Sequence, residues 1–207
     1  MLRILGYAAS INVRKVLWAC DELGLDYRRE DRGDAAHPTS DPAFLALNPF
    51  GLVPVIDDGG TIVRESNTIL RYLAARHGRV DLLPADPAAR AQVEAWMDWQ
   101  ASDFNNSWRV AFQGLVRRHP DHRQRAAIDA SVAAFSRAVA IVDAQLAATG
   151  GHVAGAAFSL ADIPIGLSVH RWLSLPVERP RYAHVERYYA QLCERAGFRT
   201  HGRDGGP

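Results

Sequence analysis

The amino-acid sequence predicts two domains of different class, an α/β domain followed by an all-α domain. Short apolar runs typical of strands alternate with helical patterns only before residue 80, and every later apolar pattern has helical spacing. The proline-containing stretch "LLPADPAAR" lies between the two halves. We therefore expect an α/β domain at residues 1–78, a linker at 79–87 and a helical domain at 88–207.

The composition disfavours several classes of partner. Lys and Arg total 24 against 23 for Asp and Glu, so the net charge of +1 gives no indication of nucleic-acid binding. Its 48% hydrophobic content supports a sizeable core, yet no apolar run approaches the ~18 residues of a membrane span. Only Cys20 and Cys193 occur, both in expected helices, and no signal peptide is recognisable. We expect a cytoplasmic protein without nucleic-acid or membrane partners.

The first domain is predicted to begin with a strand that leads into a helix. The strand is "MLRILGY", and it stops at "AAS". Ser10 or Asn12 can cap the helix, and Gly24 stands where a helix usually ends. One helical face carries the apolar residues Val13, Val16, Leu17, Cys20 and Leu23.

Further elements follow up to residue 78. A weaker strand is expected at 26–31, then a long polar loop, "RGDAAHPTSDPAFLALNP". Near its end, Asn48 precedes Pro49 and is expected to shape the turn rather than to touch a ligand. Strands at 54–57 and 61–64 are joined by the hairpin signal "DDGG". A helix at 66–77 then ends before Gly78.

The second half contains two long apolar stripes and one capping motif. The first stripe runs from Val93 to Leu115 and the second from Ile128 to Leu146. In "FSLADI", Ser159 and Asp162 have capping-box spacing, with Phe158 and Ile163 as a hydrophobic staple. We interpret this motif as a folding device whose cap contributes about 1 kcal/mol. The tail "THGRDGGP", from residue 200 onward, is expected to be frayed.

Pro54 lies between two β-branched residues, Val53 and Val55, although proline removes a ladder hydrogen bond. Two interpretations follow. A trans proline would begin the strand, or a bend would leave the backbone of Val53 unpaired and able to bond another molecule.

The motifs taken together resemble a known family. The order strand, "SINVRKVLWACDELGL", "FLALNPFGLVPVI", "RESNTILRYLA" and a helical half with "FSLADI" is similar to bacterial cytosolic glutathione S-transferases of the serine type, which are theta- or nu-like. This resemblance implies a thioredoxin-like N-terminal domain plus an all-α C-terminal helical bundle, with Pro54 in cis. It also implies glutathione as co-substrate, no metal, a small hydrophobic electrophile as second substrate, and a homodimer.

The resemblance implies where glutathione is bound. Val53, before Pro54, offers its N–H and C=O to the cysteinyl backbone. Ser66, at a helix start, holds the γ-glutamyl carboxylate, a role compatible with ordinary N-capping. Glu65 receives the ammonium group. His37 either meets the glycyl carboxylate or is a loop residue without a role.

The resemblance leaves two candidates for stabilising the thiolate of glutathione. Ser10 is preferred, because it lies where serine-type members keep their catalytic hydroxyl, and Asn12 either adds a second donor or caps the helix. Tyr7 is the rival, since a tyrosine ends the first strand in other classes. Cys20 and Cys193 are expected to be core residues.

The electrophile is expected beside the long helix of the second half. "NNSWRVAF" supplies Trp108, Arg109 and Phe112, and Tyr7 is the fourth pocket candidate. In the alternative interpretation, Trp108 and Phe112 are core residues and Arg109 only covers the helix surface. The stretch "HPDH" falls short of a metal site.

Three functions remain open at this point. The first is conjugation of glutathione to electrophiles, and the second is glutathione-dependent disulfide reduction or isomerisation. The third is glutathione binding without turnover.

Overall fold

The computed structural model describes residues 1–206. The chain divides into two compact units, the first comprising residues 1–83 with 196–206 and the second residues 84–195. We expected the helical domain to extend to residue 207. In the structure, residues 196–206 belong to the first unit instead.

The first unit is built on a four-stranded mixed sheet. Its strands are β1 (Leu2–Leu5), β2 (Tyr27–Glu30), β3 (Val55–Asp58) and β4 (Thr61–Arg64). Their order is β2-β1-β3-β4, with β1 and β2 parallel and the other two pairs antiparallel. This sheet confirms the α/β class predicted for the first domain.

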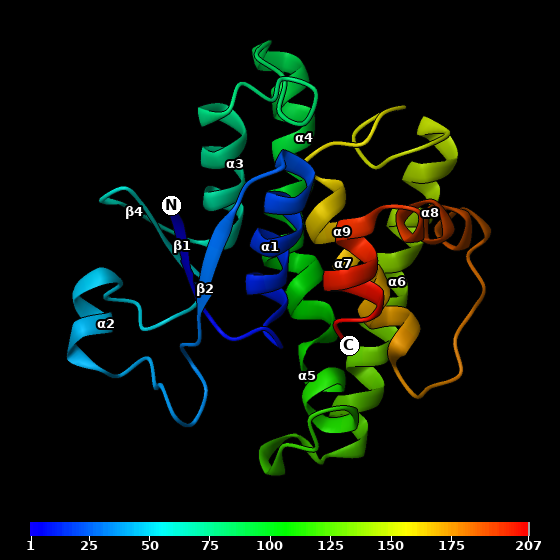
Figure 1. The fold of residues 1–207 in the computed structure, drawn as a ribbon. Helices are drawn as coiled ribbons and strands as arrows, with labels where there is room; N and C mark the ends of the chain where they lie inside the picture. Colours follow the sequence, from blue (N-terminus) through cyan, green and yellow to red (C-terminus); the bar gives the residue numbers. More distant parts are fainter. Residues whose placement is uncertain (207) are drawn as a thin grey trace. The chain divides into compact units, whose positions relative to one another are not determined.

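Helices cover both faces of this sheet (Figure 1). α2 (Pro42–Leu47) buries Phe44 against Leu5 and Val55 on one face. Neighbouring strand residues point to the opposite face. There Ile4 and Ile56 are fully buried on the side of α1 (Ile11–Leu23) and α3 (Ser66–Arg76), which contact each other. α2 lies inside the segment that we expected to be a polar loop.

The helices of the second unit, within residues 84–195, are joined by loops, and no strand longer than an isolated bridge occurs there. Its longer elements are α4 (Pro87–Trp99), a π-helical turn (Gln100–Phe104), α5 (Asn105–Leu115), α6 (Arg125–Thr149), α7 (Asp162–Ser174) and α8 (Ala183–Cys193), with a 3-10 turn at Pro120–His122. The first predicted stripe is therefore divided between α4 and α5. At the division, buried Gln100 donates a hydrogen bond of 2.9 Å from Nε2 to Oγ of Ser168 on α7.

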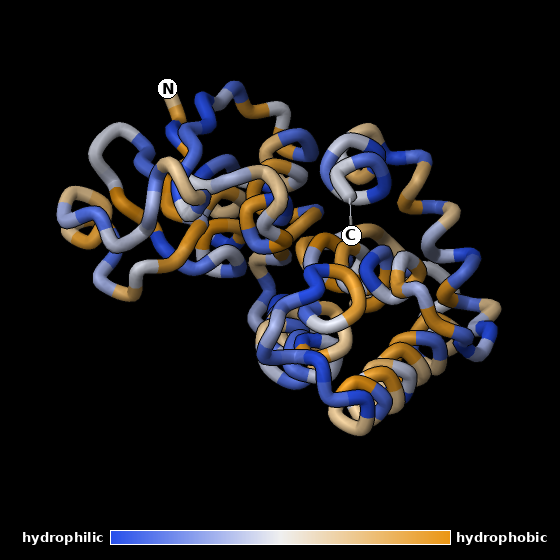
Figure 2. Tube along the Cα trace, turned by 90° about the horizontal axis from the view of Figure 1, so that it is seen from below, coloured by the Kyte–Doolittle hydropathy of each residue, from blue (hydrophilic) through white to orange (hydrophobic). Residues whose placement is uncertain are grey.

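Polar residues recur along the helices (Figure 2). Within residues 1–206, no helix is both long enough and apolar enough to cross a membrane.

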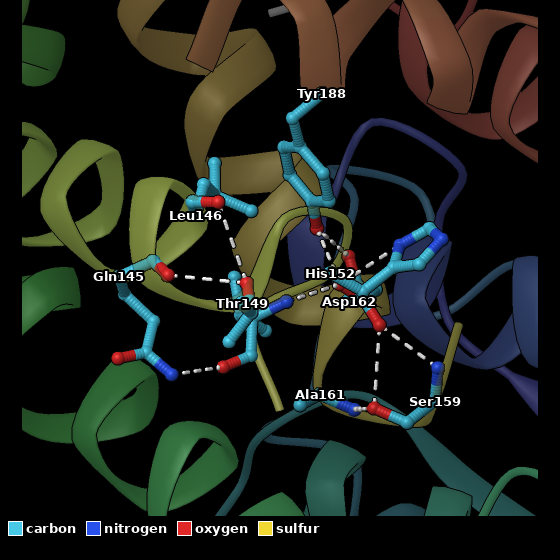
Figure 3. A network of polar contacts seen from close by, with 9 residues as sticks. Gln145, Leu146, Thr149, His152, Ser159, Ala161, Asp162 and Tyr188 are labelled. Carbon is cyan, nitrogen blue, oxygen red and sulfur yellow. Dashed lines mark hydrogen bonds and ion pairs between the residues drawn. The ribbon is translucent and has the colours of Figure 1, made fainter. Parts of the chain in front are cut away.

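Buried Asp162 organises the start of α7 (Figure 3). Its Oδ2 accepts a 2.8 Å hydrogen bond from the N–H of Ser159, the bond expected of a capping box. Its Oδ1 accepts hydrogen bonds from the N–H of Val153 at 3.1 Å and the hydroxyl of Tyr188 at 2.9 Å. Nδ1 of His152 lies 3.4 Å from the same oxygen. The predicted capping box is thus one part of a larger network.

Candidate functional site

The start of α3 forms the first part of the candidate site. Glu65, which precedes the helix, is exposed and has φ 65°, a conformation that residues other than glycine rarely adopt. Such backbone strain concentrates at functional sites. The side chain of Glu65 makes no capping hydrogen bond. The first N–H groups of α3 can therefore meet an anion, which the helix dipole favours.

The loop before β3 forms the second part. Asn48, which is 1% exposed, donates from Nδ2 to the carbonyl of Leu52 at 2.7 Å and accepts from the N–H of Phe50 at 3.2 Å. Gly51, at φ 63°, donates its N–H to the carbonyl of Asn48 at 3.0 Å. These bonds shape the turn, as we expected for an asparagine before a proline.

This turn leads into Val53, the residue before Pro54. The Val53–Pro54 peptide bond is cis, as the resemblance implied. Within residues 1–206, the N–H and C=O of Val53 have no hydrogen-bond partner. An extended residue in this state can pair with the backbone of a bound peptide in the manner of an added strand.

These parts meet in one pocket. Its volume is about 60 Å³, and it is lined by Asn12, Asn48, Leu52, Val53, Pro54, Glu65 and Ser66. The hydroxyl of Ser66, which is 7% exposed, lies 3.4 Å from Oδ1 of Asn12. The pocket thus joins the starts of α1 and α3 to the loop before β3. Sequence reasoning placed five of the lining residues at a binding site, assigned Asn48 to the turn and missed Leu52.

Ser10 lies at the N-cap of α1, two residues before Asn12 and outside the pocket lining. Its side chain makes no capping hydrogen bond, and within residues 1–206 its hydroxyl has no partner. A Cβ added to Gly6 would lie 2.4 Å from Val13 and 3.4 Å from Val53. Glycine therefore allows the end of β1 to approach both α1 and the cis-proline turn.

Tyr7 lies in the same β1–α1 turn but differs in its surroundings. Its N–H donates to the carbonyl of Arg32 at 3.0 Å, and its carbonyl accepts from the N–H of Ser10 at 3.1 Å. A Cβ at Gly33 would lie 3.2 Å from its ring, so the ring packs beside the chain after β2. Tyr7 does not line the pocket. The backbone hydrogen bonds of Tyr7 stabilise the turn between β1 and α1.

His37 also lies outside the pocket lining. It is exposed, and both its N–H and its ring Nδ1 meet Oδ1 of Asp34, at 2.7 Å and 3.1 Å. The hydrogen bond from the His37 N–H lowers the pKa of the Asp34 carboxyl. The ring of His37 is thus already held by a carboxylate in its own loop.

The two cysteines differ in burial. Burial raises the pKa of the Cys20 thiol to about 12, with a smaller contribution from Asp21. The thiol consequently stays protonated at neutral pH and is no nucleophile. Cys193 is only half-buried, so the expectation of a core residue is wrong there. Within residues 1–206, no group of three or more His, Cys, Asp or Glu side chains is arranged to hold a metal ion.

Comparisons with known proteins identify the family. A family model described as "Glutathione S-transferase, N-terminal domain" matches residues 4–81. The chain is 38% identical over 201 residues to "Glutathione S-transferase GstB" of Escherichia coli (strain K12), covering 96% of each protein. The chain belongs to the glutathione S-transferase family.

Further members of the family agree with this assignment. "Glutathione S-transferase 3" of Zea mays is 35% identical over 78% of this chain and 73% of its own length. A crystal structure of a theta class glutathione S-transferase from Xanthomonas axonopodis pv. citri, with glutathione bound, has a TM-score of 0.90. It is 38% identical and covers 97% of this chain and 96% of its own. The predicted glutathione S-transferase fold, with its thioredoxin-like first domain, is confirmed.

In the second unit, two of the predicted pocket residues are buried. Trp108 is 5% exposed and Phe112 is 3% exposed. The guanidinium of Arg171 lies over both rings, 4.3 Å and 3.7 Å from their centroids. Arg109 on α5 is exposed. Sequence reasoning missed Arg171, because nothing in the pattern of α7 shows that a cation will stack on α5 aromatics.

Proposed function

We propose that this protein is a glutathione transferase that activates the glutathione thiol for attack on small hydrophobic electrophiles. One observation carries the proposal: the open backbone of Val53 lines the same pocket as the uncapped start of α3. A peptide edge beside an anion-binding helix start is complementary to a short peptide that bears a free α-carboxylate. The similar Xanthomonas structure is described as having glutathione bound, which supports the same ligand here.

The lining residues suggest one orientation of glutathione. Its cysteinyl backbone pairs with Val53, and its γ-glutamyl carboxylate meets the N–H groups and hydroxyl at Ser66. The exposed carboxylate of Glu65 receives the ammonium group. In this orientation the carboxylate of glutathione meets N–H donors at the start of α3, and its ammonium group meets the carboxylate of Glu65.

The thiol chemistry is assigned to the start of α1. The hydroxyl of Ser10 donates a hydrogen bond to the glutathione sulfur, and the amide of Asn12 is a second donor. The positive end of the α1 dipole adds to the stabilisation of the thiolate. The thiol releases its proton to solvent water. The resulting thiolate attacks an electrophilic carbon, a carbon–sulfur bond forms, and the leaving group departs with its electron pair. Ser10 acts as a donor throughout and removes no proton.

Calorimetric titration with glutathione tests the binding site. Glu65→Ala combined with Ser66→Ala removes two charge-assisted contacts, and each contributes about 1.5–3 kcal/mol. The affinity should therefore fall by at least about tenfold. The matched control combines Glu178→Ala with Ser102→Ala, an exposed glutamate and serine in the second unit. Equal affinity of the double variant and the wild type would show that this subsite is wrongly assigned.

Turnover measurements separate the candidate reactions. Electrophiles and mixed disulfides are supplied to the wild type with glutathione, and the products are identified. Conjugates are expected. Reduced thiols without conjugates would indicate a disulfide reductase, and binding without any product would indicate a non-catalytic protein.

We also propose that the protein is a homodimer. Phe50 is 62% exposed and Leu52 60% exposed in the loop before β3, and Leu45 on α2 is 38% exposed. A Cβ at Gly51 would lie 3.6 Å from Leu45, so these side chains belong to one region of the first unit. Exposed apolar patches of this kind mark protein interfaces. Light scattering should show a dimer for the wild type and a lower mass for Phe50→Ser.

A cytoplasmic location is part of the same proposal. Both cysteines are free, as expected in a reducing compartment. Cell fractionation with an antibody against the protein tests the location, and recovery in the membrane or secreted fraction would contradict it.

A further inference from the structure

The segment 196–206, called the C-terminal strap below, packs against α1 in the first unit (Figure 1). It consists of α9 (Ala196–Phe198), a π-helical turn (Arg199–Arg203) and the residues that follow. The rings of Trp18 and Phe198, both fully buried, lie 5.0 Å apart. A Cβ at Gly197 would come within 2.5 Å of Trp18, so the close contact requires glycine there.

Polar contacts fasten the same strap. Arg14 is 3% exposed, and its Nη1 donates to the carbonyl of His201 at 3.4 Å and to that of Gly206. Nε2 of His201 lies 3.1 Å from Oδ2 of Asp21. Carbonyls at the end of a helical turn lack partners within the helix, and a cation is a favourable donor to them. Arg14, itself buried, therefore supplies a charged donor to both carbonyls.

The strap contacts follow one line along α1. Arg14, Trp18 and Asp21 have the spacing i, i+4, i+7, which places them on a single helix face. Other residues of α1 face the sheet, and nine of the ten residues from Ile11 to Cys20 are buried. The strap thus covers a face of α1 that a peripheral helix would leave in water.

Arg14 connects this face to the candidate site. Its backbone N–H donates to the carbonyl of Ser10 at 3.0 Å, in the first turn of α1. Asn12, in the same turn, lines the pocket. A displacement of this turn by a fraction of an ångström would alter hydrogen bonds made by Ser10 and Asn12, because hydrogen-bond energy depends steeply on distance and angle.

We propose that Arg14 is a positioning residue, and that the C-terminal strap holds the first turn of α1 where it can stabilise the glutathione thiolate. The inference rests on the proposed function, because it assumes that Ser10 and Asn12 face the sulfur. Arg14 itself touches no substrate in this role. It acts through the backbone of α1, and the strap carbonyls fix its side chain.

The test compares Arg14→Gln, Arg14→Lys and Arg203→Gln. Lysine keeps the cation that can reach the strap carbonyls, whereas Arg203 is partly exposed and ion-paired with neighbouring Asp204, so it serves as the matched control. The pKa of enzyme-bound glutathione is measured from the ultraviolet absorbance of the thiolate. In Arg14→Gln it should rise by about one unit, which lowers kcat/KM at neutral pH about tenfold. Glutathione affinity should change less than about threefold, because the contacts at Val53 and Ser66 remain.

Two control variants separate a positioning role of Arg14 from a purely structural one. Arg14→Lys should recover most of the lost activity, and Arg203→Gln should behave like the wild type. An unchanged thiol pKa in Arg14→Gln, with activity lost only in step with thermal stability, would overturn the positioning role. If Arg14→Gln does not fold, removal of residues 205–207 deletes the Gly206 carbonyl, an acceptor of Arg14 within residues 1–206, and should raise the thiol pKa by a smaller amount. An unchanged thiol pKa in that variant would also overturn the proposal.

Hydrogen exchange separates this proposal from the proposed function. It is measured without glutathione on the amides of residues 14–17, which follow the unpaired N–H groups of the first turn and should exchange faster in Arg14→Gln than in Arg203→Gln. A wild type that neither binds nor consumes glutathione would refute the proposed function, while the exchange data would still report whether the strap holds α1. Equal exchange in both variants would refute the strap's role alone.

Discussion

Replacing Asp162 with alanine should lower the free energy of unfolding by about 3–5 kcal/mol. The carboxylate is fully buried and accepts hydrogen bonds from the N–H of Ser159, the N–H of Val153 and the hydroxyl of Tyr188. Loss of the cap costs about 1 kcal/mol, and each buried donor left without an acceptor costs about 1–3 kcal/mol. Burial raises the pKa of Tyr188 well above its usual value, so its hydroxyl remains a donor that needs this acceptor.

Urea unfolding, followed by circular dichroism at a fixed protein concentration, measures the loss. Asp162→Asn keeps one carbonyl oxygen and should lose less stability than Asp162→Ala. The matched control is Asp129→Ala, which removes an aspartate from an exposed ion pair with Arg125 on α6 and should leave the stability nearly unchanged. A loss below about 1 kcal/mol for Asp162→Ala would show that water or loop movement replaces the missing acceptor, and the reasoning from burial would fail.

Three further predictions concern the first unit. Ser10→Ala should slow thiol chemistry about ten- to a hundredfold and raise the pKa of bound glutathione, whereas Tyr7→Phe should do little; the reverse pattern in the pH profile of kcat/KM would transfer the role to Tyr7. With Cys193→Ser as background, native Cys20 should resist alkylation at about pH 8, because a pKa of about 12 leaves roughly one thiol in ten thousand ionised; rapid labelling before unfolding would contradict its protonated state. Burial lowers the pKa of His201 below 6.5 despite the opposing effect of Asp21, so the folded state favours the neutral ring. Its contribution to stability is then complete above pH 6.5 and is lost as pH falls through the lowered pKa, and His201→Gln should flatten this part of the stability profile in urea titrations at several pH values.

Local signals in the sequence predicted the elements that carry the pocket. Gly24 ends α1 in a left-handed conformation, φ 64°, as its position after an apolar stripe indicated. Ser66 begins α3 at the predicted residue. These features depend on the nearest few residues, and they therefore appear in a single sequence.

Features that depend on distant residues were not predictable in the same way. α2 was missed because its six residues are too few to show a helical apolar period, although Asp41 caps it and Phe44 fills the sheet face. The segment from residue 200 onward looked like a frayed tail because it is rich in glycine and charge. Its anchoring depends on Arg14, almost two hundred residues earlier, and no local pattern records that contact.

Side-chain roles at the site show the same limit. Ser10 and Tyr7 lie in one turn, and sequence spacing does not show that Ser10 takes the N-cap position of α1 while the ring of Tyr7 packs beside Gly33. Trp108 and Phe112 have the spacing of a core stripe and the chemistry of a pocket, and only the structure shows that both are buried, with the guanidinium of Arg171 over their rings.

The discontinuous first unit has a consequence for how the protein is made. Its sheet and first three helices are complete once residue 83 has been synthesised, but the strap that covers Trp18 emerges only after residues 84–195. During translation at about 5–20 residues per second, α1 must therefore spend several seconds with its outer aromatic face unprotected by its own chain. Until the strap emerges, the nascent first unit presents Trp18 and Arg14 to solvent, although both side chains are buried in the finished protein.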